Sequence, residues 1–157
     1  MLGLLVAVAA ILHAQTPDSA ARVHQLAAIQ ALDDSLTGVS AAAAGFRADL
    51  ATASPDLIVS RAGRLQRRCI AADGEGQRLA KLDSLDPRFR RELAALRSAL
   101  GRCIADFTTG PGRNPLDSIA AWAPYRLARL DDAIRRYRTV AHGLKWQLEP
   151  HRSSSRG

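Results

Sequence analysis

Apolar residues recur at alternating steps of three and four residues along four stretches of the chain. The clearest stretch follows residue 87, where the apolar positions are Phe89, Leu93, Leu96, Leu100, Cys103 and Phe107. Residues 23–50, 58–72 and 127–144 show the same alternation. This spacing places apolar side chains on one face of an α-helix and is typical of a helical bundle or a coiled coil. No useful length of chain alternates with a period of two, so no strand is predicted.

Each stretch is preceded by a residue pair that suits the first turn of a helix. A short polar residue is followed at once by proline at Thr16-Pro17, Ser54-Pro55, Asp86-Pro87 and Asn114-Pro115. The polar side chain can accept a hydrogen bond from a free N–H, and proline has no N–H to leave unpaired. We therefore expect an all-α fold, an up-and-down antiparallel four-helix bundle. Its helices should lie near residues 17–52, 55–83, 87–108 and 115–147.

Glycine and proline raise the question of whether these helices are continuous. Gly38 lies within the first helix, Asp73-Gly74-Glu75-Gly76 within the second and Pro124 within the fourth. Glycine costs a helix about 1 kcal/mol relative to alanine, and proline removes a helical hydrogen bond. The sequence leaves open whether the first helix is broken at Gly38 and the fourth at Pro124.

The two cysteines predict the course of the second helix. If the second turn lies near Leu85, Cys69 and Cys103 sit on antiparallel neighbours within about 3 Å of the same height. A turn at Gly74 would separate them by roughly 34 Å. We therefore expect the second helix to continue past its glycines and a Cys69–Cys103 disulfide to join helices two and three. The alternative is two reduced, buried cysteines.

The first residues predict export. Leu2 to Leu12 form an uninterrupted apolar run, which is long enough for the core of a signal peptide and too short to span a bilayer. We expect a signal peptide over residues 1–14, a bundle over 15–149, a disordered tail over 150–157 and no membrane span beyond the leader. No Lys or Arg precedes the run, so an extension of the first helix or a short anchor is the alternative. A disulfide agrees with a periplasmic or secreted protein.

The charge of the chain points to a class of partner. The net charge is +7, and the chain is only 4% aromatic. A basic balance favours anionic partners, although arginine can also simply solvate a surface. The candidate basic face comprises Arg61, Arg64, Arg67, Arg68, Arg88 and Arg91. We expect it to bind an anionic lipid, a polysaccharide or a protein partner, whereas nucleic acid is disfavoured because no aromatic residues interleave with the arginines.

No motif in the sequence predicts catalysis or a bound cofactor. A G-x-S-x-G nucleophile elbow is absent, and a cysteine in a disulfide is not a nucleophile. The acidic pairs Asp33-Asp34 and Asp131-Asp132 are adjacent on a helix, where neighbours diverge by about 100°. We interpret them as solvated charge and expect a non-enzymatic protein.

Two histidines suggest an alternative function. In an up-and-down bundle, the start of the first helix and the end of the fourth share one end of the molecule. His24 and His142 could ligate a haem iron or a metal there. The arrangement is loosely similar to periplasmic four-helix cytochromes, which place ligands on the first and last helices, although this chain has no C-x-x-C-H. The alternative is therefore a small-ligand or haem carrier using the bundle interior near His24 and His142; otherwise both are half-exposed surface histidines.

Overall fold

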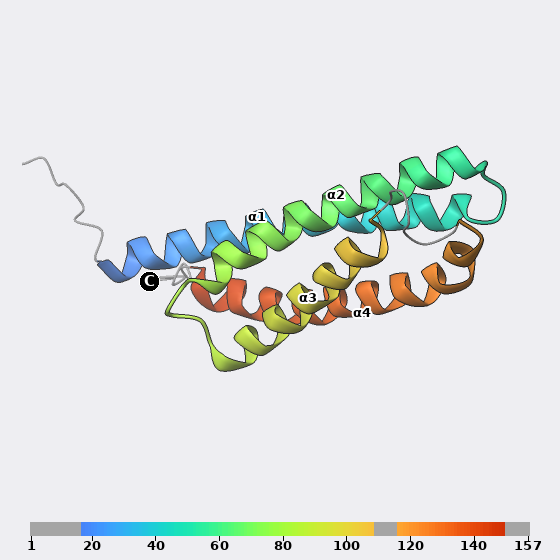
Figure 1. Ribbon diagram of the computed structural model, residues 1–157. Helices are drawn as coiled ribbons and strands as arrows, with labels where there is room; N and C mark the ends of the chain where they lie inside the picture. Colours follow the sequence, from blue (N-terminus) through green and yellow to red (C-terminus); the bar gives the residue numbers. More distant parts are fainter. Residues whose placement is uncertain (1–16, 109–115, 150–157) are drawn as a thin grey trace, which may run out of the picture.

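The described part of the chain forms four α-helices. They are α1 (Pro17–Asp49), α2 (Pro55–Ala80), α3 (Pro87–Asp106) and α4 (Leu116–Leu148). The computed structural model describes residues 17–108 and 116–149, and no strand occurs within these two ranges. Successive helices run antiparallel, with α1 and α2 as one long pair and α3 and α4 beside it (Figure 1). Each helix packs mainly against two others, in the ring order α1, α2, α3, α4. The predicted all-α four-helix bundle is confirmed.

Most of the apolar positions predicted from the sequence form the core, whereas Val23, the first position predicted for α1, is 61% exposed. All six of those predicted for the third helix are buried, and so are Ile29, Leu32, Leu36, Val39, Ala43 and Phe46 of α1. Aromatic contacts lie towards both ends of the bundle. Phe107 contacts Phe46 and Trp122, with ring centroids 5.2 and 5.3 Å away. Near the other end the rings of Phe89 and Tyr137 lie 5.6 Å apart. Burial of these faces provides most of the driving force for folding.

Glycine and proline do not interrupt the helices. As the cysteine spacing predicts, α2 continues past its glycines to Ala80. A Cβ atom at Gly76 would lie 3.1 Å from Cγ of Arg97, so the glycine allows the arginine stem of α3 to cross α2 closely. The helix α1 is continuous at Gly38, and α4 is continuous at Pro124. Pro124 is exposed, so the carbonyl that loses its helical partner can bind water instead.

The start of α3 is capped as predicted, whereas the start of α2 is not. The Asp86 carboxylate accepts hydrogen bonds from the backbone N–H groups of Arg88 and Phe89, at 2.8 and 3.2 Å. The predicted side-chain cap at Ser54 is wrong, because Ser54 makes no such bond. An ionised carboxylate is a much stronger acceptor than a neutral hydroxyl, and the exposed hydroxyl of Ser54 can bind water. The caps predicted at Thr16 and Asn114 lie outside the described residues.

A disulfide joins α2 to α3, as the cysteine spacing predicts. The Cα atoms of Cys69 and Cys103 lie 6.3 Å apart, and both residues are buried. Polar contacts flank the bond on both sides. Gln66 donates to the hydroxyl of Thr108 at 2.7 Å, and Asp73 pairs with Arg97 at 3.2 Å. The alternative of two reduced cysteines is therefore excluded in this structure.

The predicted leader (1–14) and tail (150–157) lie outside the described residues. None of the four described helices contains a segment long and apolar enough to cross a membrane. The disulfide is compatible with an exported protein, since such bonds persist in oxidising compartments.

Candidate functional site

The six predicted basic residues fall into two separate groups. Arg61, Arg64, Arg67 and Arg68 lie in the first half of α2, whereas Arg88 and Arg91 lie at the start of α3. The start of α3 lies near the end of α2. The C-cap residue of α2, Lys81, is 13 residues after Arg68. At the helical rise this is about 20 Å along α2. The two groups therefore cannot act as one compact site.

Two arginines of the α2 group belong to the contact between α1 and α2. Nε of Arg61 lies 2.7 Å from Oδ2 of Asp49, a close ion pair whose N–H is not aligned as a hydrogen bond. The stem of Arg68 lies over Gly38 of α1, where an added Cβ would be 3.4 Å from its Cδ. Arg61 is neutralised by its partner, and both the stem and the guanidinium of Arg68 lie against α1 at Gly38.

The other two arginines lie on the free side of α2 together with exposed apolar side chains. Arg64 and Arg67 are exposed, and neither has an acidic partner in the described part of the chain. Val59 and Ile70 are 37% and 50% exposed, and their separation of about three turns puts them on one side of the helix. Arg67 is three residues before Ile70, so their side chains are neighbours on the helix surface. We refer to Val59, Arg64, Arg67 and Ile70 as the outer face of α2.

The second predicted group lies at the turn between α2 and α3. Arg88 and Arg91 are exposed and form no side-chain ion pair with any described residue. Arg90, between them, has a structural role, because its guanidinium donates to the carbonyl oxygens of Leu82, Asp83 and Leu85. None of the large apolar residues that are exposed in the described chain lies within this turn. Arg88 lines a groove with Phe89, Val140 and Leu144, so the apolar surface next to this group is recessed rather than carried on exposed side chains.

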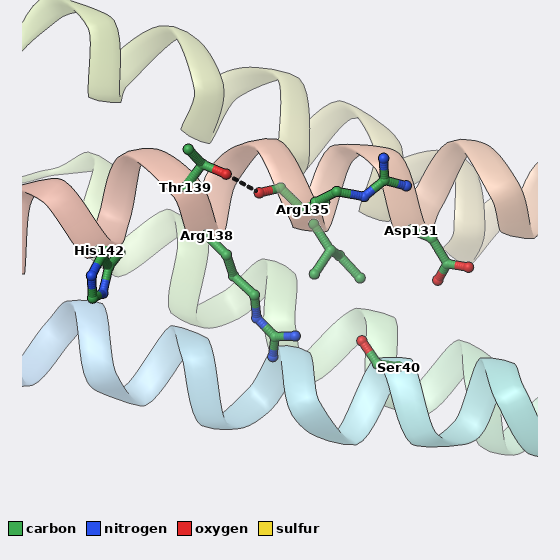
Figure 2. A pocket seen from close by; sticks show the side chains of 7 residues that line it. Ser40, Asp131, Arg135, Arg138, Thr139 and His142 are labelled. Carbon is green, nitrogen blue, oxygen red and sulfur yellow. Dashed lines mark hydrogen bonds between the residues drawn. The ribbon is translucent and has the colours of Figure 1, made fainter.

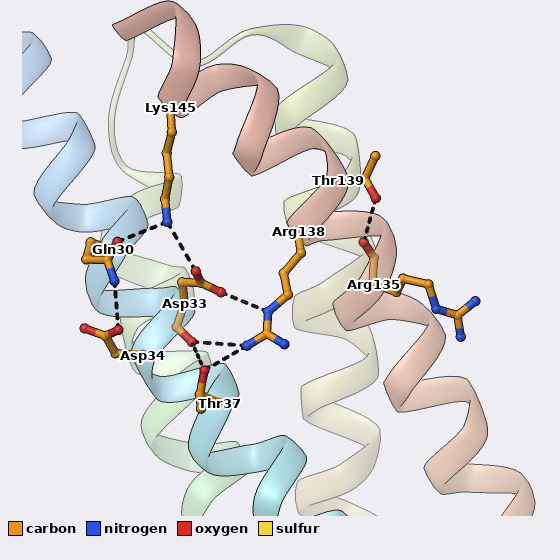
Figure 3. Close-up of polar contacts among 8 residues, drawn as sticks. All are labelled: Gln30, Asp33, Asp34, Thr37, Arg135, Arg138, Thr139 and Lys145. Atoms are coloured by element: carbon orange, nitrogen blue, oxygen red, sulfur yellow. Dashed lines mark hydrogen bonds and ion pairs between the residues drawn. The ribbon is translucent and has the colours of Figure 1, made fainter. Parts of the chain in front are cut away.

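Polar side chains connect α1 to α4 (Figure 3). The carboxylate of Asp33 accepts hydrogen bonds from Nε of Arg138 at 2.9 Å and from Nζ of Lys145 at 3.2 Å. Farther along, Arg47 of α1 pairs with Asp131 of α4. The prediction that the acidic pairs are solvated charge is therefore wrong for Asp33 and Asp131. One member of each pair faces the neighbouring helix and forms an ion pair with it.

Two ionisable groups on this side of the bundle have shifted pKa values. Partial burial alone would raise the pKa of Asp33, but the hydrogen bonds and charges of Arg138 and Lys145 outweigh it and hold the pKa below its ordinary value. Burial, aided by the charge of Asp33, raises the pKa of the Tyr137 phenol. The Tyr137 hydroxyl is buried and has no hydrogen-bond partner among the described residues. At neutral pH Asp33 is therefore charged and Tyr137 is neutral.

A groove of about 540 Å³ lies between α1 and α4 (Figure 2). It is lined by Ser40, Asp131, Ile134, Arg135, Arg138, Thr139 and His142. Its charged side chains already have partners of opposite charge. Asp131 pairs with Arg47, Arg138 with Asp33, and Arg135 with an aspartate one turn earlier on α4. The groove therefore offers little unsatisfied charge to attract an ionic ligand.

The two predicted ligand histidines do not come together. The hydrogen bonds from Lys145 to Gln30 and from Arg138 to Thr37 define the register of α1 and α4. This register places His142 at the height of Asp33, whereas His24 lies nine residues earlier on α1, or about 14 Å away along the helix. Both histidines are exposed. Nowhere in residues 17–108 and 116–149 do three His, Cys, Asp or Glu side chains gather to hold a metal ion.

Several residues that stand out in the structure were not selected from the sequence. Val59 and Ile70 directly follow the predicted apolar positions Ile58 and Cys69 in the sequence. They fall outside the spacing of three and four residues, and this departure could have identified them as exposed apolar residues. Arg102 and Arg129 are exposed and have no acidic partner in the described helices. The sequence feature that could have identified them is a hydroxyl residue four positions before each arginine. This residue is Ser98 for Arg102 and Tyr125 for Arg129.

Comparisons of the chain with protein-family models, with curated proteins and with solved structures give no match.

Proposed function

We propose that this chain is a non-enzymatic, exported protein that attaches to an anionic lipid surface through the outer face of α2. The observation that supports the proposal most directly is the pairing of two kinds of group on that face. Arg64 and Arg67 carry positive charge without acidic partners among the described residues, and on the same outward half of the helix Val59 and Ile70 expose apolar side chains, with Ile70 next to Arg67. Both kinds are matched by a lipid surface, which has anionic head groups above an apolar interior.

The apolar side chains favour lipid over the other anionic partners expected from the sequence. A polysaccharide would satisfy Arg64 and Arg67 but would leave Val59 and Ile70 in water. An arginine close to an anionic membrane contributes about 1 kcal/mol, so the two together contribute about 2 kcal/mol, or roughly 30-fold in affinity. Attachment of this strength is reversible and sensitive to salt.

Export is supported by two features of the chain. The Cys69–Cys103 disulfide is of a kind that persists in oxidising compartments. The apolar run from Leu2 to Leu12 has the length of a signal-peptide core. An exported protein of this charge would meet anionic lipid at the surface of a cell envelope.

Vesicle co-sedimentation tests the proposed surface. The protein should bind vesicles containing phosphatidylglycerol and should not bind vesicles of phosphatidylcholine alone. The double variant Arg64→Gln/Arg67→Gln should bind about 30-fold more weakly. The matched control, Arg88→Gln/Arg91→Gln, removes the same charge from the α2–α3 turn and should weaken binding by less than about threefold. An equal loss in both variants would show that net charge, rather than the outer face of α2, determines binding.

A second variant separates lipid from other anionic partners. Val59→Ser/Ile70→Ser keeps the charge of the face and removes its apolar side chains. If the face inserts at the lipid surface, this variant should bind phosphatidylglycerol vesicles about five- to tenfold more weakly, because apolar burial contributes about 25 cal/mol per Å². Unchanged vesicle binding would contradict insertion and favour an anionic polymer as the partner.

A further inference from the structure

A groove between α3 and α4 has a different chemical character from the groove between α1 and α4. It encloses about 440 Å³, within the range of roughly 300–1,000 Å³ that is usual for small-molecule sites. Part of its lining is apolar and comes from Ala95, Ala128 and Ala133. The polar lining includes Ser98 and Arg102 from α3 and Tyr125, Arg129, Asp132 and Arg136 from α4.

The charges that line this groove are not balanced. Arg136 pairs with Asp132 at 2.9 Å and with Glu92 at 3.6 Å. Arg102 and Arg129 have no acidic partner in the described chain, and each is held by a neutral hydroxyl on its own helix. Nη1 of Arg102 donates to Ser98 at 2.9 Å. Nη1 of Arg129 donates to the Tyr125 hydroxyl at 2.9 Å. Two guanidinium groups are thus oriented by hydrogen bonds without being neutralised.

The Cα atoms of Arg102 and Arg129 lie at nearly the same height on facing helices. The ion pairs Arg126–Asp106 and Arg136–Glu92 define the register of α3 and α4. This register places Arg102 within one or two residues of the level of Arg129, or about 3 Å along the bundle. Both arginines line the groove, and their bonds to Ser98 and Tyr125, each one turn towards the start of its own helix, draw the two guanidinium groups towards opposite ends of it.

We infer that the groove between α3 and α4 binds a small oxyanion, a carboxylate or a phosphate monoester, that carries an apolar group. A guanidinium has five N–H donors, and the hydroxyl partner uses one of them. The remaining donors of each guanidinium match the oxygens of an anion in the groove, and the second guanidinium adds to the positive potential there. The apolar group of the ligand would lie on the alanines and on the ring of Tyr125, which is 60% exposed.

The exposed tyrosine also orients one of the arginines. Cζ of Arg129 lies 5.7 Å from the centroid of the Tyr125 ring, within the range of a cation–π contact. This contact and the hydroxyl bond hold the guanidinium over the ring. An arginine restrained in this way loses less side-chain entropy when it binds an anion.

This site goes beyond the proposed attachment to lipid and depends on different residues. The outer face of α2 and the groove between α3 and α4 have no residue in common. Loss of one kind of binding in a variant can therefore be distinguished from loss of the other.

Calorimetric titration with phenyl phosphate tests the inference. We expect saturable binding of one phenyl phosphate per chain, weakened at least about tenfold in Arg102→Gln/Arg129→Gln, because the variant loses charge-assisted hydrogen bonds to the anion. The control Arg78→Gln/Arg88→Gln removes the same charge outside the groove and should change the affinity by less than about twofold. Circular dichroism establishes that all variants are folded. Absence of saturable binding, or an equal loss of affinity in the control, would overturn the inference.

Inorganic phosphate serves as the second probe. It carries the same oxyanion without an apolar group and should bind several-fold more weakly than phenyl phosphate. Tyr125→Ala should reduce this preference, because it removes the exposed ring. Equal affinities for the two probes in the unmodified protein would overturn the role assigned to the apolar lining.

Discussion

The α1/α4 side of the bundle and the outer face of α2 use charged residues in opposite ways. Between α1 and α4, Asp33 is bound by Arg138 and Lys145, and Arg47 pairs with Asp131. On the outer face of α2, the arginines have no acidic partner in the described chain, and Arg67 lies beside the exposed side chain of Ile70. The first arrangement holds two helices together, whereas the second leaves charge available for another molecule.

This difference shows why net charge is a poor guide to function. The net charge of +7 counts Arg138, which is paired with Asp33, in the same way as Arg67, which has no acidic partner among the described residues. Only the position of each arginine relative to the acidic residues of neighbouring helices distinguishes the two roles. Ion pairs at half-exposed positions add modestly to stability, while unpaired cations add to the potential of the surface.

The largest expected effect concerns the covalent attachment of α2 to α3. Cys69→Ala/Cys103→Ala opens a loop with a sequence separation of 34 residues. By the loop-entropy estimate this lowers the free energy of unfolding by about 4 kcal/mol. Denaturant unfolding, with and without a reducing agent, measures the loss. The reducing agent should destabilise the unmodified protein and leave the variant unchanged; a loss below about 1 kcal/mol would contradict the estimate.

A smaller effect is expected on the side held by ion pairs. Asp33→Asn removes the charge that Arg138 and Lys145 share, and it should lower the free energy of unfolding by about 1–2 kcal/mol at neutral pH. Partial exposure of all three side chains keeps the effect modest. Urea unfolding at neutral pH measures this loss, and a variant as stable as the unmodified protein would show that this network does not hold α1 to α4.

The same residue gives the α1/α4 side a distinct pH dependence. The pKa of Asp33 is held below its ordinary value of 3.8, so its stabilisation is complete above that value and is lost as the pH falls through the lower pKa of the folded state. Urea midpoints measured from neutral pH down to this range should fall more steeply for the unmodified protein than for Asp33→Asn. Parallel curves would contradict the assignment.

Most of the fold could be predicted from the sequence because it depends on local signals. Apolar spacing gave the four helices and nearly all of the core, and the cysteine spacing settled the continuity of α2 through Gly74 and Gly76. The sequence could not settle Gly38 or Pro124, because only tertiary packing and solvent exposure determine whether a helix tolerates such residues. Ser54 was predicted to cap α2 because serine is a common residue at that position. The residue type alone does not specify the direction in which the hydroxyl points.

The candidate sites were less predictable because they depend on pairing across helices. The pattern of Arg61, Arg64, Arg67 and Arg68 identified the right helix. It could not show that Arg61 is neutralised by Asp49 or that Arg68 lies over Gly38, since both contacts come from α1. The facing arrangement of Arg102 and Arg129 likewise depends on the register of α3 and α4, which the sequence does not specify.

The most direct test of the two uses of charge measures stability and vesicle binding together for Asp33→Asn and Arg64→Gln/Arg67→Gln. We expect Asp33→Asn to lose stability while binding phosphatidylglycerol vesicles like the unmodified protein. The double arginine variant should keep its free energy of unfolding within about 0.5 kcal/mol and lose vesicle binding. If vesicle binding instead follows net charge in both variants, strengthening in Asp33→Asn as it weakens in the other, the distinction between paired and free arginines is contradicted.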